Sequence, residues 1–143
     1  MQQLTAINPD KLTSFNPFAA VRDFHIKYDA GVNEELTEDN LFLRLNLINE
    51  EHDEILGEFL DEEEDLWFPT YKLPEKIDKK ALTKELSDLI YVVIGTGVQL
   101  GLPLEEVFKR THYSNMTKST EKREDGKVLK GENYVPPNLD DLF

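Results

Sequence analysis

Two short acidic motifs contain the residues of this chain that are best suited to chemistry. Glu51 and Glu54 lie three residues apart in LINEEHDEILGEF, and Glu85 and Asp88 have the same spacing in LTKELSDLIYVV. Residues three or four apart share one face of an α-helix. Both motifs are surrounded by Leu, Ile and Val, so each acidic face is expected to pack inward. Inward-facing carboxylates are costly unless a cation lies between them, and Mg²⁺ prefers such oxygen ligands.

A single E-x-x-E motif would favour a solvated helix face, because the chain contains 29 Asp and Glu residues. Two such motifs, each inside an apolar run, favour a metal site instead. Glu50 lies four residues before Glu54 and therefore shares an edge of the same helical face. We expect two helices whose acidic faces oppose each other across divalent metal ions.

Composition restricts the remaining possibilities. A chain of 143 residues suits one domain with a single core. The net charge of −13 argues against tight binding to a nucleic-acid backbone. The chain has no cysteine, which excludes disulfides, thiolate zinc sites and cysteine nucleophiles. No run approaches the ~20 apolar residues of a membrane span, and the N-terminal segment lacks the pattern of a signal peptide. A cytoplasmic protein is expected.

Capping signals predict four helices and little strand. Asn, Thr and Asp are favoured N-caps, Pro is favoured in the first turn, and Gly is a common stop. Residues 61–77 hold two prolines and an acidic run and are expected to form a loop, packed down by Trp67, Phe68 and Tyr71. The helices are expected to begin at Asn16–Pro17, after Thr37, after Asp78 and at Pro103, and the first three to end at Gly31, near Leu60 and near Leu100.

Short connections between helices predict an all-α fold, an antiparallel four-helix bundle. One domain spanning residues 1–143 is expected, with a helical core at about 16–118 and a C-terminal tail at 119–143. The residues expected to face inward are Phe18, Val21, Phe24, Tyr28, Leu41, Leu45, Ile48, Ile55, Phe59, Leu104, Val107, Phe108 and Thr111.

The last predicted helix carries polar residues that could bind a phosphate group. Its inward stripe continues through His112 to Asn115, and Lys118 follows one turn later. His112 alone is more simply a core residue with satisfied hydrogen bonds. A lysine offers a point charge suited to phosphate, so Asn115 with Lys118 favours a ligand site. The tail adds Lys127, Lys130 and Tyr134, and this mixture of amide, lysines and phenol suits a triphosphate.

Four segments together carry a resemblance to a known superfamily. They are NEEHDEIL, KELSDLIYVV, THYSNMTK and DGKVLKGENYVPP. The chain resembles the MazG-like, all-α nucleoside triphosphate pyrophosphohydrolases over roughly residues 18–137, a superfamily that includes dimeric dUTPases and phosphoribosyl-ATP pyrophosphatase. The last two segments resemble a narrower group of short, single-domain enzymes. The 30-residue separation of Glu54 and Glu85 is long for this group, and such a loop could change base preference or a subunit contact.

The resemblance implies hydrolysis of a (deoxy)nucleoside triphosphate to a monophosphate and pyrophosphate, with a metal-activated water attacking the α-phosphorus. It also implies two or more Mg²⁺ ions, replaceable by Mn²⁺, and a homodimer or homotetramer. Glu51, Glu54, Glu85 and Asp88 match the metal ligands. Glu50 and Glu51 are the expected catalytic carboxylates, and either could act as the base. The residues implied in nucleotide contact are Asn115 and Lys118, with His25 either lining the base pocket or lying on the surface as an ordinary helix residue.

Three alternatives stay open from sequence alone. The chain could be a phosphoribosyl-ATP pyrophosphatase, although its SNMTK and DGKVLKG segments favour the triphosphate enzymes. It could be a catalytically silent helical bundle that binds nucleotide or metal. A di-iron bundle would use Glu-x-x-His pairs, and no histidine here has Glu three residues before it. Base and sugar preference is open, so house-cleaning, dUTP removal and control of a dNTP pool all remain candidate roles.

Overall fold

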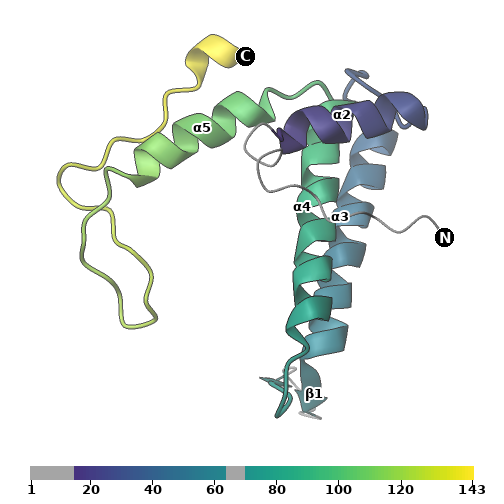
Figure 1. Ribbon diagram of the computed structural model, residues 1–143. Helices are drawn as coiled ribbons and strands as arrows, with labels where there is room; N and C mark the ends of the chain where they lie inside the picture. The colour runs from purple at the N-terminus through teal and green to yellow at the C-terminus, as the bar shows by residue number, and fades with distance from the viewer. Residues whose placement is uncertain (1–14, 64–69) are drawn as a thin grey trace. The chain divides into compact units, whose positions relative to one another are not determined.

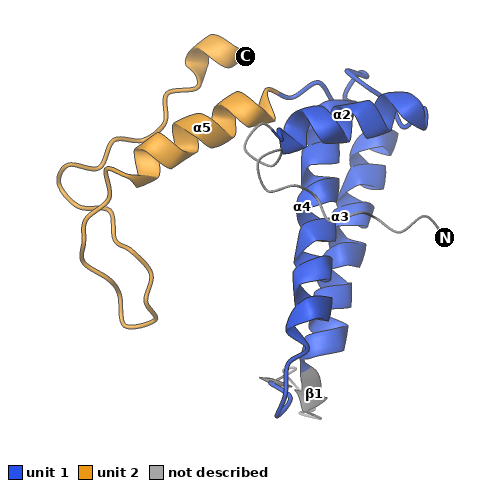
Figure 2. Cartoon of the chain, viewed as in Figure 1, with its two compact units in different colours: residues 1–102 blue, residues 103–143 orange. Residues whose placement is uncertain are grey.

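The computed structural model describes residues 15–63 and 70–143, and α-helices make up most of this part of the chain (Figure 1). Contacts divide the chain into two compact units, residues 1–102 and 103–143 (Figure 2). The elements of the first unit are α2 (Pro17–Lys27), α3 (Glu38–Phe59), β1 (Asp61–Glu63), β2 (Thr70–Lys72) and α4 (Lys79–Gln99), and those of the second are α5 (Leu104–Asn115) and the short 3₁₀ helix η1 (Asp140–Leu142).

Three of the predicted helix starts are confirmed by capping hydrogen bonds. The Asn16 side chain accepts from two N–H groups of the first turn of α2, the nearer at 2.8 Å. Thr37 Oγ1 caps α3 at 3.2 Å, and Asp78 Oδ1 caps α4 at 2.9 Å. The predicted helix end near Leu100 is also confirmed: α4 ends at Gln99, and Gly101 follows with a φ of +62°, in the left-handed region that favours glycine. The first helix ends earlier than expected, at Lys27.

Helices α3 and α4 lie side by side, and α2 lies across one end of the pair and packs on α4 (Figure 1). The buried apolar residues of the described chain come from all three helices and the residue after α4. They are Val21, Phe59, Ile94 and Leu100. No helix in the described residues is long and apolar enough to cross a membrane.

A buried guanidinium joins α3 to α4. Arg44 on α3 is 6% exposed, and its Nη2 donates to the carbonyl of Val92 at 2.8 Å. Its Nε donates to Thr96 Oγ1 at 3.2 Å. Burying a charged group without such hydrogen bonds would be costly, so these bonds favour one alignment of the two helices.

The connection between α3 and α4 is not entirely the loop that was predicted. β1 pairs antiparallel with β2, with Glu62 opposite Tyr71, and the two strands form a short ribbon. Acidic residues are poor strand formers, which explains why composition alone suggested a loop. Trp67 and Phe68 lie outside the described residues.

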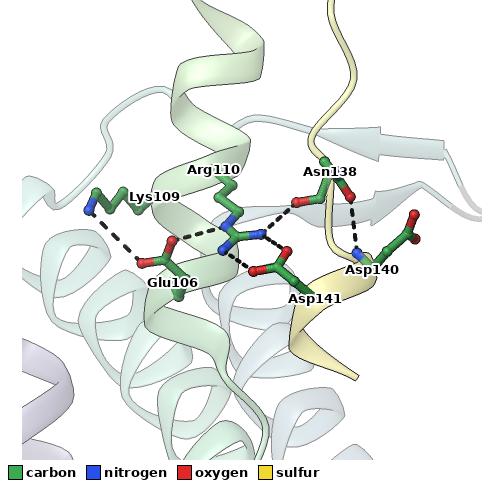
Figure 3. A network of polar contacts seen from close by, with 6 residues as sticks. All are labelled: Glu106, Lys109, Arg110, Asn138, Asp140 and Asp141. Atoms are coloured by element: carbon green, nitrogen blue, oxygen red, sulfur yellow. Dashed lines mark hydrogen bonds and ion pairs between the residues drawn. The ribbon is translucent and has the colours of Figure 1, made fainter.

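In the second unit, the C-terminal segment folds back onto α5. Arg110 on α5 donates to the carbonyl of Asn138 at 2.8 Å and to Asp141 Oδ2 at 2.9 Å, and it also pairs with Glu106 (Figure 3). Ser114 Oγ donates to the carbonyl of Val135 at 2.6 Å. The segment expected to be a tail therefore forms one compact unit with α5. Within that segment, residues 119–131 form a hairpin-like arm closed by backbone hydrogen bonds.

Several residues predicted to face inward are exposed. Phe24, Tyr28, Leu45 and Phe108 are 41%, 59%, 48% and 65% exposed, respectively. Helical periodicity identifies an apolar face, but it does not reveal whether a neighbouring element of the same chain covers that face. The predicted inward positions of these four residues are therefore wrong for the single chain.

Candidate functional site

Three of the predicted metal ligands come together between α3 and α4. Glu51 and Glu54 lie one turn apart on α3, and Glu85 lies on α4. One carboxylate oxygen from each lies within 4.8 Å of the other two. Glu85 is buried, Glu51 is half-buried and Glu54 is exposed, so the cluster reaches from the helix interface to solvent.

Asp88, the fourth predicted ligand, is linked to this cluster through a lysine. Lys84 Nζ lies 2.6 Å from Asp88 Oδ2 and 3.3 Å from Glu85 Oε1. Sequence reasoning missed Lys84. The signal was its position four residues before Asp88, because oppositely charged residues at this spacing meet on a helix surface.

Crowding of the carboxylates is visible in their electrostatics. Burial raises the pKa of Glu51, and repulsion from Glu54, Asp88 and Glu85 raises this pKa further, while the positive charge of Lys84 opposes the rise. Hydrogen bonds to Asp88 and Glu85 in turn raise the pKa of Lys84. Ionisation of Glu51 is thus disfavoured by burial and by the neighbouring negative charges, and an added cation would relieve the repulsion.

The donor set suits a divalent cation. Carboxylate oxygens that approach one another so closely match the all-oxygen coordination preferred by Mg²⁺ and Mn²⁺. Glu50 precedes Glu51 on α3 and has an exposed side chain, and it is not one of the three clustered residues. The residues present therefore fit a metal centre formed by α3 and α4, with Glu50 adjoining it along the chain.

The second unit brings together three of the predicted phosphate contacts. Lys130 Nζ lies 4.7 Å from the centroid of the Tyr134 ring. A hydrogen bond with Ser114 lowers the pKa of Tyr134, and the positive charges of Lys130 and Lys118 lower it further. A small hollow of about 210 Å³ beside this group includes Lys118 and Gly131 in its lining. Lys118, Lys130 and Tyr134 thus form a positively charged corner, which we call the basic corner.

The other predicted nucleotide contacts of this unit have different surroundings. His112 and Asn115 lie in the last turn of α5 with exposed side chains, so the predicted inward position of both is wrong. The Asn115 carbonyl accepts a hydrogen bond from the Lys118 N–H at 3.1 Å, so the two residues lie in one turn. Lys127 is exposed in the 119–131 arm, where its N–H donates to Asp125 Oδ1.

His25 is not an ordinary surface residue in this structure. Its side chain is buried, with only 3% exposed. Nδ1 lies 2.7 Å from the carbonyl of Gly31, which assigns the proton to Nδ1. Nε2 lies against Gly95 on α4. Burial shows that the predicted surface position is wrong, and the contacts of His25 join α2 to α4. The predicted contact with the base stays a prediction.

These features define an α-helical protein with a carboxylate cluster shared by two adjacent helices. Residues 26–115 match the phosphoribosyl-ATP pyrophosphohydrolase family, and the chain belongs to that family. This family is part of the MazG-like all-α nucleoside triphosphate pyrophosphohydrolase superfamily, so the superfamily inferred from the sequence motifs is confirmed. The matched segment contains α3, α4 and α5, hence both acidic motifs, and ends before Lys118. No curated protein matches the chain.

The family indicates a pyrophosphohydrolase that acts on nucleotides. Enzymes of this kind typically use divalent metal ions, in agreement with the acidic cluster between α3 and α4.

Proposed function

We propose that the protein hydrolyses a (deoxy)nucleoside triphosphate to a nucleoside monophosphate and pyrophosphate, using Mg²⁺ or, in its place, Mn²⁺. The observation that carries the proposal is the approach of Glu51, Glu54 and Glu85 within 4.8 Å in a chain of a pyrophosphohydrolase family. A substrate with three phosphates brings its own negative charge, so a site made of carboxylates needs cations to bind it.

Glu51, Glu54, Glu85 and Asp88 would hold two or more ions. When bound, these ions would neutralise the triphosphate and lower the pKa of a water molecule, which makes it a nucleophile for the α-phosphorus. Glu50 is exposed next to the cluster on α3, and its carboxylate would orient that water or accept its proton. Glu51, which is half-buried in the cluster, is the other candidate base.

The basic corner of the second unit supplies the contacts expected for phosphate oxygens. Lys118 and Lys130 place positive charge beside Tyr134, whose hydroxyl can donate to a phosphate oxygen. Asn115, in the turn that leads to Lys118, adds an amide next to this group.

We also propose that the working form is a homodimer or homotetramer, built from antiparallel helices of several chains. Large apolar side chains of α3 and α4 are exposed in the single chain, among them Phe42 at 63% and Ile90 at 59%. An open groove of about 700 Å³ between these helices includes Phe42, Leu45 and Val93 in its lining. Contiguous exposed apolar surface of this kind is typical of an interface between chains.

Phosphoribosyl-ATP is the second candidate substrate, because the matched family takes its name from hydrolysis of that compound. It also carries a triphosphate, so the same carboxylate cluster would serve it. The two candidates differ at the far end of the molecule, where phosphoribosyl-ATP has a second ribose phosphate.

One panel experiment tests the proposal. Purified protein with Mg²⁺ or Mn²⁺ is incubated with each NTP, each dNTP and phosphoribosyl-ATP, and monophosphate, pyrophosphate and orthophosphate are resolved. We expect monophosphate and pyrophosphate from at least one nucleoside triphosphate, and the loss of this activity in Glu85→Gln. Turnover of phosphoribosyl-ATP alone would establish the second candidate. Release of orthophosphate and diphosphate would contradict the proposed cleavage site.

A further inference from the structure

Lys84 makes an unusual set of contacts for an exposed lysine. Its ammonium group lies 2.6 Å from a carboxylate oxygen of Asp88 and 3.3 Å from one of Glu85. Its side chain is nevertheless 63% exposed, whereas that of Glu85 is only 8% exposed. One flexible cation thus contacts both of the α4 carboxylates proposed as metal ligands.

The surroundings of Lys84 distinguish it from a routine surface ion pair. An isolated lysine–aspartate pair at this spacing would serve only to stabilise the helix slightly. Here one acceptor, Glu85, is buried and belongs to a group of three carboxylates with oxygens within 4.8 Å of one another, so Lys84 brings positive charge to the edge of that group. The ammonium therefore neutralises part of the charge that a metal ion would neutralise.

We propose that Lys84 is a built-in counter-ion of the acidic cluster, which a divalent ion must displace, and that Lys84 thereby sets the metal concentration at which the site fills. The inference rests on the proposed metal-dependent function. Two cations cannot share the same carboxylate oxygens without mutual repulsion, so the ion pairs of Lys84 weaken metal binding. Because the lysine side chain is largely exposed, it can move into solvent without loss of packing.

The test compares the Mn²⁺ affinity of the full-length wild type with that of Lys84→Met, by calorimetry or by the Mn²⁺ electron paramagnetic resonance signal. Met keeps the length and the helix propensity of the side chain but removes its charge. We expect the Kd for Mn²⁺ to fall roughly two- to fivefold. Lys84→Arg, which keeps the charge, should retain an affinity close to that of the wild type.

Lys80→Met is the matched control. Lys80 is exposed on α4 one turn before Lys84, and no ion pair joins it to a carboxylate of the described residues. Lys80→Met removes the same charge from the same helix. Because that charge does not contact the acidic cluster, the variant should change the Kd for Mn²⁺ much less than Lys84→Met does. In 1 M salt the difference between Lys84→Met and wild type should shrink, because salt screens exposed charges.

Thermal unfolding supplies a second readout. Without metal, Lys84→Met should melt at a lower temperature than the wild type, because the carboxylates lose their counter-ion. In saturating Mn²⁺ the two melting temperatures should converge. An unchanged or weaker Mn²⁺ affinity in Lys84→Met would overturn the inference while leaving the metal centre in place. A wild type that binds no Mn²⁺ would overturn the proposed function together with the inference.

Discussion

The guanidinium of Arg44 on α3 lies in direct contact with the backbone of Gly95 on α4. A Cβ at position 95 would come within 2.5 Å of Arg44 Nη2 and within 2.8 Å of His25 Nε2. Gly95 therefore leaves the space in which two buried polar side chains reach α4. Those side chains come from α2 and α3, so this small residue lies where the three helices of the first unit meet.

Gly95→Ala should destabilise the protein by about 1–3 kcal/mol, because the new methyl group would displace Arg44 from its bonds or His25 from its packing. Urea unfolding measures the free energy. Gly57→Ala is the matched control, because Gly57 lies in α3 and has no neighbour within 4 Å of an added Cβ. It should be neutral or stabilising by up to ~1 kcal/mol. Equal stability of both variants would show that the contact is easily accommodated.

The paired change Glu51→Gln with Glu54→Gln should raise the melting temperature of the metal-free protein by a few degrees. It removes two mutually repelling charges while keeping the ion pairs between Lys84 and α4. The same change should abolish the rise in melting temperature that we expect on adding millimolar Mg²⁺, since metal binding stabilises only the folded state. Differential scanning calorimetry with and without Mg²⁺ measures both effects.

Glu35→Gln, an exposed residue outside the cluster, is the control for this pair. It should leave both the melting temperature and its response to Mg²⁺ as in the wild type. A metal response that survives the paired change would place the metal centre elsewhere in the chain.

Lys118→Ala should weaken binding of a non-hydrolysable nucleoside triphosphate by about 1.5–3 kcal/mol, because a charged hydrogen bond to phosphate is lost. Tyr134→Phe should weaken it less, since only a neutral hydroxyl is removed. Titration calorimetry in the presence of Mg²⁺ measures both. Lys122→Ala, an exposed lysine in the 119–131 arm, should bind like the wild type. If Lys118→Ala also binds like the wild type, the basic corner is not a phosphate site.

The contact between Arg110 and Asp141 should loosen in acid. The hydrogen bonds from Arg110 lower the pKa of Asp141 below its ordinary 3.8. The ionised carboxylate therefore stabilises the folded C-terminal segment above about pH 4, and this contribution is lost as the pH falls through the lowered pKa. The protection of the amides of residues 138–143 against hydrogen exchange, relative to the intrinsic rate at each pH, should fall over that range. Asp141→Asn should show this low protection at every pH, whereas Asp125→Asn should behave like the wild type.

Local signals in the sequence predicted much of the framework. Asn16, Thr37 and Asp78 each begin a helix as expected, because a capping hydrogen bond involves only residues two or three positions away. The two acidic motifs also predicted which helices would adjoin, since a carboxylate cluster needs both of them.

Features that depend on contacts between distant residues were not predictable in the same way. The burial of His25 follows from Gly95, which lies 70 positions later and is small enough to admit the ring. Phe108 is exposed although its spacing on α5 predicts an inward position, because helical spacing does not show whether another element covers that face. The β1–β2 ribbon likewise rests on pairing across the connection, where acidic residues conceal any strand signal.

The bonds from Arg44 to Val92 and Thr96 have a consequence for where the acidic cluster forms. Arg44 lies about two helical turns before Glu51, and Glu85 lies about two turns before Val92. The two bonds of Arg44 therefore help to fix the register of α3 against α4. Sliding one helix by a single turn would break the Arg44 bonds and would also separate Glu85 from Glu51 and Glu54. A side chain that would bind neither metal nor nucleotide thus determines which carboxylates meet.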